Sequence, residues 1–72
     1  TDDLDTINGG ANGDIIVLQA ANSARTVVAK HATGNLRLNG VADFNLDNAN
    51  DVLVLMYNGS AWLEIARSSN GA

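Results

Sequence analysis

Short apolar runs separated by turn-forming residues recur along the chain, and each run has the length of a β-strand. Two runs, residues 14–20 and 51–57, are strongly apolar and rich in β-branched residues. Residues 36–39 and 43–46 alternate apolar and polar positions with a period of two. The pattern predicts strands over residues 4–7, 14–20, 26–31, 36–39, 43–46, 51–57 and 61–67.

Asn-Gly pairs mark many of the breaks between these runs. Five occur, at residues 8–9, 12–13, 39–40, 58–59 and 70–71. Asn-Gly tolerates the positive φ that a type I′ turn requires at both central positions, so it is a strong local signal for a hairpin. Strand starts about 8–12 residues apart are typical of all-β folds. We therefore expect an all-β fold, a small antiparallel meander or sandwich-like unit of six or seven short strands.

The two strong runs begin similar segments, residues 14–35 and 51–72. Laying Asp14 on Asp51 without gaps matches the paired serines, Ser23 and Ser60, and several apolar positions. The similarity predicts two hairpins related by pseudo-symmetry within a single domain of residues 1–72, each with its turn at the serine. Chance similarity between two strand-turn-strand units is the alternative.

Neither strong run alternates, so both faces of each predicted strand require burial. A chain of 72 residues covers one face of such a sheet at best, and chains of this size are marginally stable alone. We therefore expect an obligate oligomer in which another copy covers the second face. The predicted interface and core residues are Ile15, Ile16, Val17, Leu18, Val52, Leu53, Val54, Leu55 and Met56.

Composition narrows the classes of function. The chain has no Cys, which excludes disulfides and thiolate metal sites, and no Pro. Its net charge of −4 and four scattered Lys and Arg residues argue against binding to nucleic acid or to an anionic membrane. The longest apolar run, residues 52–57, is far shorter than a membrane span. Without an initiator Met or a signal peptide, the sequence reads as a fragment or a processed piece.

Acidic residues near the start offer a possible cation site. Asp2, Asp3 and Asp5 could bind a hard cation, but we favour a solvated terminus. Residues 9–14 partly match the G-G-x-G-x-D repeat of calcium-binding β-rolls, with Asn12 where that repeat has Gly. The match occurs once and lacks a stacked neighbour, so we favour a turn and predict no metal site.

Catalytic groups are equally sparse. His31 is the only histidine and has no Ser, Cys or paired carboxylate near it in the sequence. Asp43 and Glu64 could in principle form a glycosidase-like pair, but nothing around them favours this over solvent-facing strand positions. We predict no catalytic residue and no cofactor, and expect that the protein is not an enzyme.

Two aromatic residues near the last predicted turn are candidate ligand contacts. Tyr57 and Trp62 could stack on a sugar ring or anchor a partner if they are exposed. The interpretation we favour places Trp62 in a core of small aliphatic side chains. Residues 58–60 match a glycosylation sequon, which a tight turn explains equally well.

Three segments together resemble a module of tailed-bacteriophage tail fibre and tailspike-type proteins. They are G-D-I-I-V-L-Q-A-A-N-S-A-R-T-V-V-A-K at residues 13–30, G-N-L-R-L-N-G at residues 34–40, and D-V-L-V-L-M-Y-N-G-S-A-W-L-E-I-A-R-S at residues 51–68. The resemblance covers nearly the whole chain, although turn-and-strand signatures are less specific than a catalytic motif. It implies a β-rich, homotrimeric module that is structural or receptor-facing, and it brings no catalytic residues.

The resulting expectation is a non-enzymatic virion structural module, a homotrimeric fibre or spike component used for trimerisation or host attachment. Its partners would be its own copies, other virion proteins and a host surface glycan or protein, without nucleic acid or membrane insertion. One alternative is a capsid decoration, cement or head-fibre protein. The other is a carbohydrate-binding module that uses Tyr57 and Trp62.

Overall fold

The chain is all-β, as the turn and strand pattern predicts. The computed structural model describes residues 2–22 and 24–70. They form strands β1 (Asp2–Leu4), β2 (Ile15–Gln19), β3 (Val27–Ala29), β4 (Leu36–Arg37), β5 (Phe44–Leu46), β6 (Val52–Tyr57) and β7 (Trp62–Ser68), with a short 3-10 turn, η1 (Asn39–Val41), before β5. Six predicted strands contain the observed ones to within a residue. The first strand was predicted too late in the chain, at residues 4–7, whereas β1 ends at Leu4.

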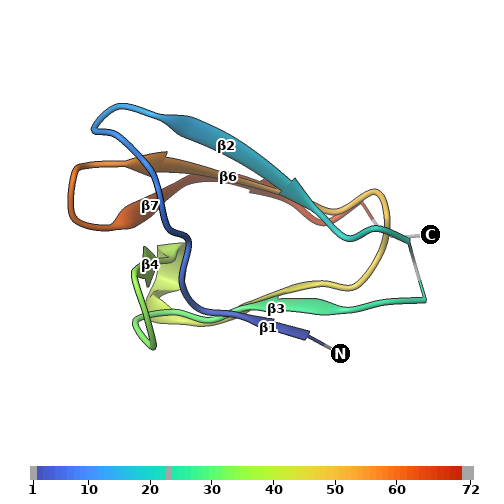
Figure 1. Cartoon of the computed structure of the whole chain (residues 1–72). Helices are drawn as coiled ribbons and strands as arrows, with labels where there is room; N and C mark the ends of the chain where they lie inside the picture. The colour runs from blue at the N-terminus through green and yellow to red at the C-terminus, as the bar shows by residue number, and fades with distance from the viewer. Residues whose placement is uncertain (1, 23, 71–72) are drawn as a thin grey trace.

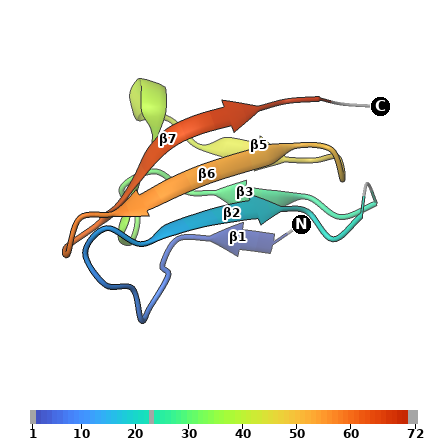
Figure 2. The same cartoon turned by 90° about the horizontal axis from the view of Figure 1, so that it is seen from above.

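Two sheets lie one above the other (Figure 1). One has the strand order β1-β3-β5 and the other the order β2-β6-β7-β4. The predicted antiparallel meander is wrong, because β1 pairs with β3 and β4 pairs with β7 in parallel. Seen from above, β2, β6 and β7 run side by side across the upper layer (Figure 2). Alternation of apolar residues specifies which face of a strand is buried, but it does not specify the neighbouring strand.

The predicted pair of hairpins is half correct. β6 and β7 form an antiparallel hairpin with Tyr57 opposite Trp62. β2 and β3 do not pair, because β2 joins β6 in the upper sheet and β3 joins β1 and β5 in the lower one. Ser23, the predicted turn of the first hairpin, lies outside the described residues. The two similar strands, β2 and β6, are instead antiparallel neighbours.

The core fills the space between the sheets. Leu53, Leu55 and Trp62 enter it from the upper sheet, and Ala29, Phe44 and Leu46 enter it from the lower one, with Ala20, Leu36 and Leu38 completing the cluster. The carboxylate of Asp51 is fully buried at the end of this core. Its Oδ1 accepts a hydrogen bond from the backbone N–H of Asn70 (2.9 Å), and its Oδ2 accepts one from that of Asp47 (3.2 Å).

The β6–β7 turn differs from the predicted type I′ geometry. Gly59 has a φ of +91°, but Asn58 does not have a positive φ. Instead, Asn58 Oδ1 accepts hydrogen bonds from the backbone N–H groups of Ser60 (3.0 Å) and Ala61 (2.7 Å). The loop between β6 and β7 therefore has four residues, 58–61, and not the two of a type I′ turn. The side chain of Asn58 closes it. Of the other Asn-Gly pairs, the last includes Gly71, which lies outside the described residues.

Candidate functional site

The side of the upper sheet that faces away from the lower sheet, called the outer face below, is built by β2, β6 and β7. Cross-strand partners in an antiparallel sheet point to the same side. Val17 is opposite Val54, which is opposite Ala66, and Ile15 is opposite Met56, which is opposite Leu63. By this register the outer face comprises Ile15, Val17, Gln19, Val52, Val54, Met56, Leu63, Ala66 and Ser68. Ile65, at the β-bulge, has no partner on β6 and is assigned to the outer face because it is exposed.

Large apolar side chains of the outer face are open to solvent. Ile15 is 60% exposed, Val17 61% and Ile65 53%. Val52, Val54, Met56 and Leu63 are half-buried by their neighbours on the sheet. Contiguous apolar patches of this kind mark interaction sites on soluble proteins.

The structure divides the predicted interface residues into two sets. Ile16, Leu18, Leu53 and Leu55 point inward and belong to the core of the chain or pack against it. Ile15, Val17, Val52, Val54 and Met56 point to the outer face. Strands β2 and β6 are therefore apolar on both sides, and residues 2–22 and 24–70 cover only one of these sides.

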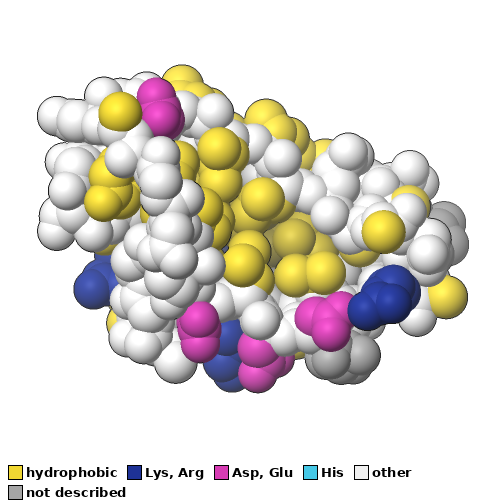
Figure 3. Space-filling model, in the orientation of Figure 1, with side chains coloured by type: hydrophobic (Ala, Val, Ile, Leu, Met, Phe, Trp, Pro, Cys, Tyr) yellow, Lys and Arg dark blue, Asp and Glu magenta, His cyan; other side chains and the backbone are white. Residues whose placement is uncertain are grey.

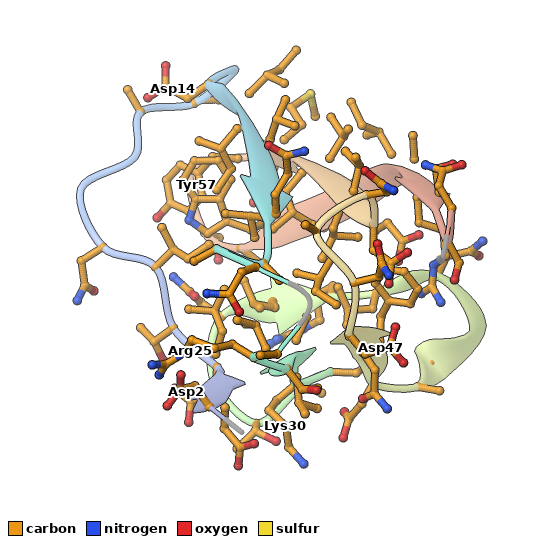
Figure 4. All side chains as sticks on the ribbon, turned by 90° about the vertical axis from the view of Figure 1, so that its right-hand side faces the viewer. Asp2, Asp14, Arg25, Lys30, Asp47 and Tyr57 are labelled. Carbon is orange, nitrogen blue, oxygen red and sulfur yellow. The ribbon has the colours of Figure 1, made fainter. Side chains whose placement is uncertain are left out.

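Charged side chains are excluded from the outer face along β2, β6 and β7. The two charged residues of these strands, Glu64 and Arg67, point inward and pair with each other (Oε1–Nη2 2.7 Å). The Arg67 guanidinium lies 4.2 Å from the centroid of the Phe44 ring, and the backbone N–H of Asn39 donates to Glu64 Oε1. Arg67 thereby holds the pKa of Glu64 below its ordinary value. Side chains above the sheet in Figure 4 are mostly carbon.

Two large apolar residues of the outer face, both on β7, were not among the predicted interface residues. Leu63 and Ile65 alternate with Trp62 and Glu64 along β7, so a period-two pattern was present in the sequence. A β-bulge between Val54 and Leu55 on the β6–β7 ladder interrupts that period. After Ile65 the bulge shifts the alternation by one residue, so that Ala66 and not Arg67 follows Ile65 on the outer face. Alternation in the sequence alone therefore does not show which residues of β7 lie on the outer face.

Trp62 is a core residue, as the favoured interpretation predicts. It is 2% exposed, and its Nε1 donates a hydrogen bond to the carbonyl of Ile7 (3.2 Å). Its ring lies 4.9 Å from that of Tyr57, and Gly10 packs so closely that a Cβ there would be 2.6 Å from Trp62 Cζ2. The alternative of an exposed aromatic pair is wrong for Trp62, because its ring has no free face on which a sugar could stack.

The remaining candidate groups are engaged by local partners. His31 Nδ1 accepts a hydrogen bond from the backbone N–H of Leu38 (2.9 Å). Asp43 pairs with Lys30 (2.9 Å) and accepts from the backbone N–H of His31 (2.7 Å), and Lys30 lowers the pKa of Asp43. Asp43 and Glu64 thus each pair with their own cation, an arrangement that stabilises loops and does not present two free carboxylates to a substrate.

Two of the aspartates that were considered as cation ligands, Asp14 and Asp2, have structural partners. Asp14 Oδ2 accepts from the backbone N–H of Ala11 (2.9 Å), which closes the turn before β2. Asp2 pairs with Arg25 (2.6 Å), and the two side chains lie together in Figure 4. Among residues 2–22 and 24–70, no three His, Asp or Glu side chains form a group able to hold a metal ion.

The described part of the chain has no pocket and no helix long and apolar enough to cross a membrane. Comparisons with protein-family models, with curated proteins and with solved structures find no match to this chain. The outer face is therefore the candidate interaction site of the described residues.

Proposed function

We propose that this chain is a non-enzymatic structural module that assembles with identical copies through the outer face. The observation that carries the proposal is the exposure of Ile15, Val17 and Ile65 on a sheet face whose strands place no charge there. An uncharged apolar face is unfavourable in water and becomes favourable when another apolar surface covers it. A second copy of the chain supplies such a surface without any further component.

Burial of the outer face on assembly would add free energy of unfolding comparable to what a short chain without disulfides lacks. Full burial of a Val, Leu or Ile side chain contributes about 1.5–3 kcal/mol, so burial of the exposed half of each outer-face side chain contributes roughly half of that. Several such side chains per copy add a few kcal/mol to a small core without disulfides. Assembly therefore stabilises the fold as well as joining the copies.

The proposed number of copies is three, and the proposed place is a phage fibre or spike. Both rest on the resemblance of the sequence to tail fibre and tailspike-type modules. The segments that carry the resemblance include all of β2, β6 and β7, the strands that build the outer face. In such a particle the module would hold three chains in register or present its loops to a host surface. Electron microscopy of particles would separate a tail location from a capsid location.

Sedimentation equilibrium at low micromolar concentration tests the proposal. A mass of three chains supports it, and a folded, stable single chain contradicts it. A variant in which Val17 is replaced by Asp keeps the core unchanged, so it separates loss of assembly from loss of folding.

A further inference from the structure

In the described part of the chain the two sheets have four edge strands, and three of these edges are protected. The lower sheet ends at β1 and β5, and the upper sheet ends at β2 and β4. β1 is three residues long and carries Asp2 and Asp3, while Asp43 and Asp47 flank β5. Short strands and charged residues are the usual protection against edge-to-edge pairing.

The β4 edge is covered by its own loop. β4 consists of Leu36 and Arg37 only. The carbonyl of Leu36 accepts hydrogen bonds from the backbone N–H of Ala32 (2.9 Å) and from Nη1 of Arg37 (3.0 Å). Those contacts occupy the acceptor that another strand would need, so β4 is a poor site for strand addition.

The β2 edge is the least protected of the four, since Asp14 flanks it at one end only and the Oδ2 of Asp14 already accepts a hydrogen bond from the backbone N–H of Ala11. The strand is five residues long and contains no charged residue and no Pro. The backbone N–H of Tyr57 donates to the carbonyl of Asp14 (2.8 Å), so the backbone groups of Asp14 and of every second residue after it point toward β6. Because backbone groups alternate between the two sides of a strand, those of Ile15, Val17 and Gln19 point away from β6. The same three residues place their side chains on the outer face.

Apolar side chains continue beneath the open β2 edge. Leu4, Ile16, Leu18 and Val27 are only partly buried against the core. Hydrophobic side chains gather in the middle of the molecular surface between the two layers in Figure 3, whereas most charged side chains lie along its lower part. A strand added to β2 would therefore meet an apolar surface as well as free backbone groups.

A second open stretch lies on β7. β4 pairs with its first two residues only, Leu36 with Trp62 and Arg37 with Leu63. The following residues, 64–68, have no strand on that side in the described part of the chain. This stretch is also five residues long and carries Ile65, Ala66 and Ser68 of the outer face.

The two open stretches are placed so that copies can join in a ring. β2 and β7 are both antiparallel to β6, so they run in the same direction on opposite sides of it. Rotation about an axis along the strands places β2 of one copy beside β7 of the next as a parallel pair. Three such steps close a ring that leaves neither edge open.

We propose that the β2 edge of one copy pairs in parallel with residues 64–68 of β7 in the next copy, and that the ring encloses the outer face. This inference rests on the proposed function for the number of copies. The rival arrangement is a two-fold pairing of β2 with β2 of another copy, centred on Val17. That arrangement joins two upper sheets edge to edge but leaves the outer face of both exposed, whereas the ring buries it.

Disulfide trapping in the full chain tests the pairing. The chain contains no Cys, so every cross-link comes from an introduced residue. Ala66→Cys is combined in turn with Ile15→Cys, Val17→Cys or Gln19→Cys, because the register along the edge has to be scanned. A disulfide needs Cα atoms roughly 4.4–6.8 Å apart, which restricts it to neighbouring strands. The matched control is Ala66→Cys with Asn45→Cys, an exposed position on β5.

The ring predicts covalent trimers on a non-reducing denaturing gel for at least one of the three β2 variants, with the control and each single variant remaining at the mass of one chain. Dimers from Val17→Cys alone would overturn the ring in favour of the two-fold pairing. A trimer in sedimentation without any cross-link would overturn the edge pairing and leave the proposed function standing. Single chains in sedimentation would overturn both.

Discussion

Leu53 and Val54 are consecutive residues of β6 whose side chains serve two different apolar layers. Leu53 is fully buried between the two sheets, in the same core cluster as Leu55 and Trp62. Val54 lies on the outer face, between Val17 of β2 and Ala66 of β7. One short strand thus contributes both to the core of a single chain and to the surface that we propose is covered by another copy.

Replacement of either residue by Asp separates these two layers. Leu53→Asp buries an unpaired carboxylate in the core, so we expect a loss of several kcal/mol and an unfolded chain by circular dichroism. Val54→Asp places the charge on the outer face and is expected to abolish assembly. Because assembly contributes stability by mass action, the melting temperature of the parent rises with protein concentration and that of Val54→Asp does not.

The control for this pair is Asn45→Asp, a change at an exposed position of β5, which should leave both folding and assembly unchanged. An assembled Val54→Asp variant with parental stability would show that the outer face is not the contact between copies.

Trp62 is expected to be a stability determinant. Trp62→Ala removes a side chain that is 2% exposed, and we expect a loss of about 3–5 kcal/mol in urea unfolding. Trp62→Phe should cost less, because a ring remains in contact with Tyr57 and the carbonyl of Ile7 keeps its hydrogen bond from Asn35 Nδ2 (2.8 Å). Parental stability of Trp62→Ala would contradict the placement of this ring in the core.

Two glycines should respond differently to the same substitution. A Cβ at Gly34 would collide with the backbone carbonyl of Asp5 and with Thr6 Oγ1, so Gly34→Ala requires the segment after β1 to move. At Gly59 the cost is backbone strain, since φ is +91° and the nearest atoms are those of Asn12 at ordinary contact distances. We expect about 1–2 kcal/mol for Gly59→Ala and more for Gly34→Ala in denaturant unfolding. The reverse order would contradict the close approach of residues 5–6 to Gly34.

Asp47 gives the fold a specific dependence on pH. A side-chain hydrogen bond with the neighbouring carboxylate of Asp51 and partial desolvation raise the pKa of Asp47 above its ordinary value. A carboxyl whose pKa is raised on folding contributes stability below its unfolded pKa, and this contribution is lost as the pH rises through the folded value. Asp47→Asn cannot ionise and retains a donor, so we expect it to be more stable than the parent at neutral pH.

That gain should shrink as the pH falls below the ordinary pKa of an aspartate, where the parent is protonated as well. Thermal unfolding at neutral and acid pH measures the difference, and Asp5→Asn, at an exposed loop position, is the control. If Asp47→Asn were less stable than the parent at neutral pH, the proximity of the Asp51 carboxylate would not destabilise the ionised form of Asp47.

Local chemistry accounts for most of what could be predicted from the sequence. Six strands were located because apolar runs and turn residues act over a few neighbouring positions. The parallel pairing of β4 with β7 depends on contacts between Leu36 and Trp62, far apart in the chain, and no local pattern encodes it. The two apolar sides of β6 could be predicted because they depend only on the residues of that strand. The open edge of β2 could not, because it depends on which strands pair with one another.

The side chain of Asn58 shows a second limit. Asn-Gly correctly marked the turn between β6 and β7, but the geometry followed from two hydrogen bonds to Asn58 Oδ1 and not from a positive φ at that residue. The same dipeptide supports both geometries, so the sequence predicts the place of the turn better than its type.

Assembly through the outer face is the central claim, and the mass of the protein in solution tests it most directly. Sedimentation equilibrium of the parent chain at low micromolar concentration should give three times the chain mass of 7.5 kDa, and Val17→Asp should give the mass of one chain. A parent chain that is folded and stable at 7.5 kDa would contradict the account, because the exposed apolar face would then need no partner.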